Sequence, residues 1–215
     1  MPETAVPSVA PSAGPAEPGL RERRRRQTER EISDVALDLF ESRGLDHTTV
    51  DEIAGRVGVS PRTFFRYFAT KESAALLGNA DLEERVGTMV EATRPEQPLL
   101  PQLEVIWREV LRVIAEGEEG TRLLRVRRLM QHEPSLRLAG LQLDEERVSA
   151  LASRLAQITG RPDDDVRLVV ELGSAVVRHA LDRWATAAER DEHLDLLAAY
   201  EAASTAVRAE LAAGR

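Results

Sequence analysis

Apolar residues recur every three or four positions along most of the chain, which is the spacing of one face of an α-helix. The clearest example lies at residues 28–43 and ends at Gly44. Its apolar side carries Ile32, Val35, Ala36, Leu39 and Phe40. No stretch of useful length alternates apolar and polar residues as a half-buried strand does. The pattern therefore predicts an all-α protein.

Glycine and proline interrupt this pattern and divide the rest of the chain into further helices. Two short helices are expected, one at residues 50–57 and one directly after Ser60, and a longer one from Thr70 to about Thr93. Beyond Pro95 and Pro98, helices are expected at about 99–116, 119–132, 136–159, from 163 onward and 191–211. The chain is thus expected to hold about nine helices.

Residues 1–19 differ from the rest, because they are rich in Pro, Ala and Ser and lack the apolar centre of a signal peptide. We expect them to be a disordered extension. The net charge of -8 is unevenly spread: residues 20–71 carry 11 Lys/Arg and 9 Asp/Glu, whereas residues 72–215 carry 18 and 26. A slightly basic N-terminal part on an acidic body can approach phosphates while the body stays away from them.

Residues 48–71 form the most informative segment. Two short helices are joined by Gly58-Val59-Ser60, a turn in which the glycine can take a left-handed backbone conformation. Thr49 and Glu52 have the spacing of a capping box, which satisfies backbone donors at the start of the first helix. Ser60 followed by Pro61 is a typical start of the second. The segment therefore predicts a helix-turn-helix.

The second of these helices has the chemistry of a recognition helix. Arg62, Thr63 and Arg66 lie at or near its N-terminal end, from which side chains can reach base edges in a major groove. Phosphate contacts position a protein without specifying sequence, and they suit Thr49, Tyr67 and Lys71. A helix-turn-helix also occurs in proteins that do not bind DNA, and in such a protein these residues would be structural.

The three phenylalanines of this helix are divided between two roles. We expect Phe64 and Phe68 in the core, whereas Phe65 fits either the core or the DNA surface. The role of the arginine cluster at residues 21–26 also has two interpretations. It is either a flexible arm on the DNA, which we favour, or an ordinary solvated helix start. The full set expected to contact DNA is Thr49, Ser60, Arg62, Thr63, Phe65, Arg66, Tyr67 and Lys71, with Arg23, Arg24, Arg25 and Arg26.

The segment resembles the DNA-binding domain of the tetracycline-repressor (TetR) family. It carries a Thr-x-x-x-Ile-Ala core at residues 49–54, a Gly-Val-Ser turn at 58–60, and an aromatic-x-x-Phe-x-x-Lys close at Phe65, Phe68 and Lys71. One departure is Phe65, since the family usually has a tyrosine there whose hydroxyl meets a phosphate. The resemblance implies a DNA-binding domain at residues 20–70 and a helical ligand-binding and dimerisation domain at 71–215.

In that family the C-terminal helices bind a small-molecule inducer and form the dimer. The last two expected helices have apolar and small-residue faces suited to a four-helix interface, although the same stripes could be core within one chain. The expected dimer residues are Val169, Gly173, Val177, Ala180, Trp184, Leu194, Leu197, Ala198, Ala202 and Thr205. The candidate ligand-binding residues are Met89, Trp107, Met130 and His179, each of which could equally be core.

Other classes of protein find little support. The chain has no cysteine, its four histidines show no metal-ligand spacing, and it carries no phosphate-binding or nucleophile motif. No apolar run is long enough to span a membrane. We therefore expect no enzyme, metal or cofactor, but a cytoplasmic, ligand-responsive repressor that binds a palindromic DNA operator as a homodimer. The alternative is an all-helical adaptor that binds proteins and not DNA.

Overall fold

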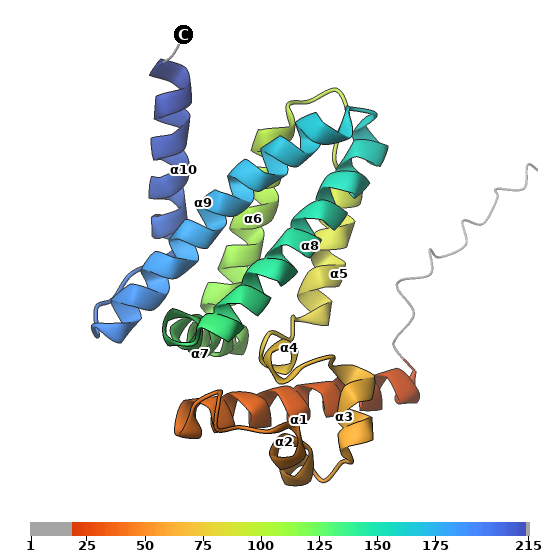
Figure 1. Ribbon diagram of the computed structural model, residues 1–215. Coiled ribbons are helices and arrows are strands. Elements are labelled where there is room, and N and C mark those ends of the chain that lie inside the picture. The colour runs from red at the N-terminus through yellow and green to blue at the C-terminus, as the bar shows by residue number, and fades with distance from the viewer. Residues whose placement is uncertain (1–18, 214–215) are drawn as a thin grey trace, which may run out of the picture.

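The computed structural model describes residues 19–213, which form ten α-helices and no β-strand (Figure 1). The prediction of an all-α fold is confirmed. The helices are α1 (Leu20–Arg43), α2 (Val50–Val57), α3 (Pro61–Tyr67), α4 (Lys71–Ala75), α5 (Ala80–Glu91), α6 (Leu99–Glu116), α7 (Glu118–His132), α8 (Pro134–Thr159), α9 (Asp163–Glu189) and α10 (Leu196–Ala213).

The helices form a small N-terminal unit and a larger bundle. In Figure 1, α1, α2 and α3 lie together at one end, and α4 lies between α1 and the bundle. Helices α5 to α9 make up the bundle, and α10 packs along α9 at its edge. The short α4 is therefore the covalent connection between the two parts.

Two hydrophobic cores correspond to these two parts. The first is built on Ile32, Phe40 and Phe64, and it also contains Val126 of α7 and Leu136 of α8. The second lies among α5 to α10. Because Val126 and Leu136 are buried in the first core, burial of apolar surface holds the N-terminal unit to the bundle. The division of the chain at residue 70 into two domains remains a prediction.

The helix expected from Thr70 to about Thr93 is broken, and that prediction was wrong. Residues 76–79 leave the helical path between α4 and α5. The Asn79 side chain accepts hydrogen bonds from the backbone N–H groups of Asp81 (3.0 Å) and Leu82 (3.1 Å), so it caps a new helix. This break gives ten helices in the described part of the chain where about nine were expected.

Two helix starts also differ from expectation. Helix α1 begins at Leu20, eight residues before the expected face, so the arginine cluster is part of it. Helix α10 begins at Leu196, where Asp195 accepts from the backbone N–H of Ala198 at 2.7 Å. Of the extension expected at residues 1–19, residues 1–18 lie outside the described part of the chain.

Candidate functional site

Helices α2 and α3 are joined by the turn that the sequence indicated. Gly58 has φ 82° and ψ 26°, a left-handed conformation, and its N–H donates to the Ala54 carbonyl at 3.0 Å. Ser60 Oγ then accepts from the backbone N–H of Thr63 at 3.1 Å, and Pro61 occupies the first helical position. These local interactions fix the start of α3 relative to α2.

The start of α2 is fixed by the expected capping box. Thr49 Oγ1 accepts from the backbone N–H of Glu52 at 3.2 Å, and Glu52 Oε2 accepts from the backbone N–H of Thr49 at 2.9 Å. These hydrogen bonds from the Thr49 backbone and hydroxyl lower the pKa of Glu52, because they stabilise its ionised form. Arg43 of α1 lies 3.3 Å from the same carboxylate.

Phe64 of α3 and Phe68, the residue after α3, lie in the core as predicted. Phe64 is fully buried and Phe68 is nearly so, and their ring centroids lie 5.8 Å apart. Phe65 is 56% exposed and meets Phe64 only edge-on. The core assignment of Phe64 and Phe68 is confirmed, and Phe65 lies on the surface, where a DNA contact remains a prediction.

The three residues expected to contact base edges all belong to α3 and differ in solvent exposure. Arg62 and Arg66 are exposed, and Thr63 is half-buried with its Oγ1 2.9 Å from Ser60 Oγ. Arg66 donates to the Tyr67 hydroxyl at 3.2 Å and its guanidinium lies 4.9 Å from the centre of that ring. The structure thus places Arg62 and Arg66 at the surface and Thr63 partly covered beside Ser60. Their contact with DNA remains a prediction.

Lys71 has a different environment from the one expected of a phosphate contact. Its Nζ donates to the carbonyl oxygens of Leu45 (2.6 Å) and Thr48 (3.0 Å) in the loop before α2. In the same loop, the backbone N–H of Leu45 donates to Glu133 at 3.2 Å. Lys71 therefore holds the α1–α2 loop to α4, and a phosphate contact remains a prediction for its third donor.

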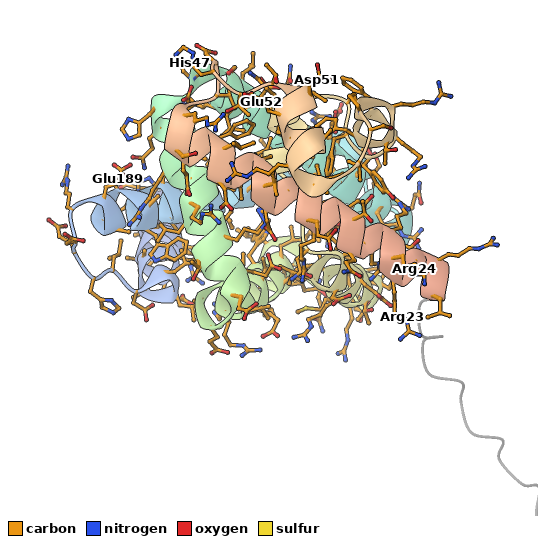
Figure 2. The ribbon with its side chains drawn as sticks, turned by 90° about the horizontal axis from the view of Figure 1, so that it is seen from below. Arg23, Arg24, His47, Asp51, Glu52 and Glu189 are labelled. Carbon is orange, nitrogen blue, oxygen red and sulfur yellow. The ribbon has the colours of Figure 1, made fainter. Side chains whose placement is uncertain are left out.

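The arginine cluster does not form an arm within the described residues, so that preferred interpretation was wrong. Arg25 lies 3.0 Å from Glu29 and Arg26 lies 3.2 Å from both Glu22 and Asp81, pairs that suit an ordered helix start. Arg23 and Arg24 extend outward at the N-terminal end of α1, whereas His47 lies at the opposite end of this face (Figure 2). Their contact with DNA remains a prediction.

A cavity of about 600 Å³ lies among α4 to α9. Trp107 and Met130 line it, as expected of ligand-binding residues. Met89 instead lines a separate open groove beside α10, and His179 is exposed on α9. The sequence placed these two residues wrongly, because it does not show which side of each helix faces the hollow.

Four arginines and three carboxylates are among the residues that line the cavity. The arginines are Arg122, Arg127, Arg147 and Arg178, and the carboxylates are Glu83, Glu119 and Asp144. Arg122 and Glu133 were not predicted from the sequence. No local signal marks either residue, because their partners in the N-terminal unit lie between 47 and 89 residues away in the chain.

The expected dimer residues fall into three groups. Ala198, Ala202 and Thr205 are exposed on one side of α10. Val169, Val177, Trp184, Leu194 and Leu197 are half-buried. Gly173 and Ala180 are buried within the single chain, so their assignment to a partner surface was wrong. A β-carbon on Gly173 would come within 1.7 Å of the Trp107 ring, which shows that α6 and α9 pack closely there.

Two further searches cover only the described residues. Between Gly19 and Ala213, no group of three histidine, aspartate or glutamate side chains is placed to hold a metal ion. Over the same stretch, no helix combines the length and the apolar character that crossing a bilayer requires.

Comparison with known proteins agrees with this geometry. The family model for bacterial regulatory proteins of the tetR family matches residues 32–74, which run from the middle of α1 into α4. The HTH-type transcriptional regulator TcmR of Streptomyces glaucescens is 35% identical over 216 residues, covering 97% of this chain and 94% of TcmR. MftR of Mycobacterium tuberculosis is 47% identical over 51 residues, covering 24% of this chain and 26% of that protein.

Among solved structures, the TetR-family repressor FadR of Thermus thermophilus, crystallised with lauroyl-CoA, is 27% identical with a TM-score of 0.48. The match covers 83% of this chain and 91% of FadR. The family motif lies on α2, α3 and α4, and TcmR is similar along nearly the whole chain. The chain therefore belongs to the TetR family of bacterial regulatory proteins and is a DNA-binding transcriptional regulator.

Proposed function

We propose that this regulator is a repressor that binds a palindromic operator as a homodimer in the cytoplasm and is released by a small molecule in the cavity. Arg62, Thr63 and Arg66 are the residues that read bases. Arginine can pair bidentately with guanine, and the threonine methyl can meet the methyl group of thymine. Ser60 contacts Thr63, Tyr67 contacts Arg66, and Thr49 caps the start of α2. These three residues suit phosphate contacts.

The proposed ligand response is supported by the position of α4, because this short helix lines the cavity and also contacts the loop before α2. Ala75, at the C-terminal end of α4, lines the cavity. Lys71, at the N-terminal end, holds the carbonyls of Leu45 and Thr48 just before α2. A ligand that displaces α4 would pass the displacement directly to this loop, and so to the position of α3.

A second path runs through α7. Arg125 of α7 donates to Asp38 at 2.6 Å and to both carboxylate oxygens of Glu41 at 2.8 and 2.7 Å on α1. These partners raise the pKa of Arg125, with Glu41 the larger cause. Since α7 also lines the cavity, its position too links ligand binding to the orientation of α1.

The dimer supplies the geometry for a palindrome. Two recognition helices related by a two-fold axis would have to meet successive major grooves, about 34–36 Å apart. A ligand that favours a subunit arrangement with another spacing would lower DNA affinity. A complete switch from 1:99 to 99:1 needs about a 10⁴-fold difference in ligand affinity between the two arrangements.

The test is binding-site selection with the purified full chain and random duplex DNA in the presence of heparin. We expect enrichment of an inverted repeat whose half-sites are about one helical turn apart. The double variant Arg62→Ala with Arg66→Ala should lose the enrichment, whereas Arg137→Ala, exposed on α8, should retain it. Absence of any enriched sequence with the unaltered chain would contradict the proposal and favour a helical adaptor that binds proteins.

A further inference from the structure

We infer that the effector is an apolar molecule with an anionic group, and that Arg122 binds this group at the cavity wall nearest the DNA-binding elements. The inference rests on the proposed function, because it names the ligand class of the same cavity. The lining of this cavity is mostly aliphatic, and four arginines interrupt it.

The aliphatic lining comes from every helix around the cavity. Leu82, Val86, Leu111, Leu123, Leu151 and Leu181 belong to it, together with the indole of Trp107. A surface of this kind gains free energy by burying an apolar body, and the few polar groups in it fix the orientation of the ligand. The bulk of the effector is therefore apolar.

Three of the four cavity arginines already face a carboxylate or the solvent. Arg127 donates to Asp182 at 3.3 Å and Arg147 donates to Glu83 at 3.4 Å. Arg178 lies 3.6 Å from Asp144, and its side chain is 36% exposed. An anionic ligand would gain the least binding free energy from these three arginines, because each is neutralised by a neighbouring carboxylate or hydrated.

Arg122 is different. Its side chain is 15% exposed, about as buried as that of Arg127 at 12%, but it has no hydrogen-bonded carboxylate within the described part of the chain. The single carboxylate within 4.0 Å among the described residues is that of Asp34, 3.7 Å from Nε and not hydrogen-bonded to it. Burial lowers the pKa of Arg122, against the opposing effect of Asp34 and Glu119. A buried guanidinium without a hydrogen-bonded anion is costly, and an anionic group from a ligand would remove much of that cost.

The hydrogen bonds of Arg122 connect this site to the DNA-binding elements. Its Nη2 donates to Ser33 Oγ of α1 and, at 3.4 Å, to the carbonyl of Ala75 at the end of α4. Ser33 Oγ in turn donates to the carbonyl of Ala74. An anion that draws the guanidinium into the cavity would compete with these neutral acceptors and loosen α1 and α4 from α7. Ligand recognition and release of the DNA-binding elements thus involve the same side chain.

The experiment uses two fluorescent probes with the same ring skeleton. The anionic probe is 8-anilino-1-naphthalenesulfonate, and the neutral one is N-phenyl-1-naphthylamine, which lacks the sulfonate. Each is titrated into the full chain. We expect the anionic probe to bind at least about tenfold more tightly, the size of one charge-assisted hydrogen bond. This comparison needs no substitution, so it remains decisive if a variant is unstable.

Three variants locate the effect. Arg122→Gln keeps a donor for Ser33 but removes the charge, and it should abolish the preference for the anionic probe. Arg147→Gln lines the same cavity and is the matched control, which should keep the preference. Ser174→Trp places an indole in the cavity and should weaken binding of both probes. Circular dichroism verifies that each variant is folded.

The experiment distinguishes failure of the anionic-site inference alone from failure of the proposed ligand response. Equal binding of both probes to the unaltered chain, or a preference that survives Arg122→Gln, overturns the inference and leaves the cavity as a site for neutral effectors. If Ser174→Trp changes the binding of neither probe, the cavity is not where they bind. The inference and the proposed ligand response then both fail.

Discussion

Arg62 of α3 and Lys71 of α4 are both cations of the family motif, but their surroundings differ. Arg62 is exposed and makes no ion pair with any residue between positions 19 and 213, so it can meet DNA without losing an internal partner. Lys71 already donates two hydrogen bonds to backbone carbonyls. The two positions should therefore respond differently to substitution.

Substituting Arg62 should change which DNA sequence is preferred. Loss of a bidentate contact to one base is expected to cost about 1–3 kcal/mol on the selected operator and to relax specificity at that base pair. Fluorescence anisotropy with the selected duplex and single-base variants measures both effects for Arg62→Ala. A uniform loss on all sequences would instead make Arg62 a phosphate contact.

Substituting Lys71 should lower stability. In Lys71→Met, the carbonyls of Leu45 and Thr48 lose their donor, and we expect the free energy of unfolding to fall by about 1–3 kcal/mol. Urea denaturation followed by circular dichroism measures this change. Unchanged stability together with weaker binding to every DNA sequence would show that Lys71 acts mainly on phosphates.

At the scale of elements, the start of α2 depends on the ionised form of Glu52. Its pKa in the folded chain is lowered below the ordinary value of about 4.3 by the Thr49 backbone N–H and hydroxyl. The stabilisation is thus fully present above that ordinary value and is lost as the pH falls through the lowered folded pKa. In urea midpoints measured from pH 7 to pH 3, the advantage of the unaltered chain over Glu52→Gln should shrink with acidity. A constant difference would count against this assignment.

The packing of α6 against α9 depends on the absence of a side chain at position 173. In Gly173→Ala the new β-carbon would overlap the Trp107 ring, and we expect the free energy of unfolding to fall by about 1–3 kcal/mol. Gly87→Ala on α5 is the matched control, because nothing lies within 4 Å of its β-carbon position. That variant should gain about 0.5–1 kcal/mol. Equal effects of the two substitutions in thermal denaturation would contradict the packing argument.

At the scale of the whole molecule, α10 has one face committed to its own subunit. Glu104 of α6 accepts from Ser204 Oγ at 2.8 Å and from Arg208 at 3.1 Å, and burial raises the pKa of the neighbouring Tyr200 to about 12. Arg108 also reaches across to Glu201 at 2.5 Å. The opposite face carries the small exposed side chains that we propose for the dimer.

A large cation on that opposite face should separate the subunits. Ala202→Arg adds charge and bulk to an exposed position, so it should leave the subunit fold intact but yield monomers in light scattering. Binding to the full palindrome should weaken accordingly, because each subunit would then bind its half-site independently. Ala92→Arg, exposed at the end of α5, is the control and should stay dimeric. A dimeric Ala202→Arg would place the interface elsewhere.

Membership of the TetR family also bears on whether the chain is an enzyme. The regulators of this family are not enzymes, so the prediction of a non-enzymatic chain is confirmed by its relatives. The palindromic operator, the homodimer and the small-molecule effector remain proposals.

Local signals explain why much of the helix-turn-helix could be predicted. Thr49, Gly58 and Ser60 act on residues within four positions of themselves, through caps and a left-handed turn. The break before Asn79 was missed because the apolar spacing continues through it. The inner faces of α5 and α9, and hence the places of Met89 and His179, could not be assigned because apolar residues occur on more than one side of these helices.

The sequence by itself determined the helical class, the caps and turn of residues 48–71, and the family, because these depend on neighbours along the chain. Only the tertiary structure decided that Lys71 holds the Leu45 loop, that Gly173 faces Trp107 within the subunit, and that Arg122 joins the cavity to α1 and α4. Those contacts join residues that are from 26 to 89 positions apart along the chain. Side-chain chemistry allows many such partners, and only the packing of helices selects among them.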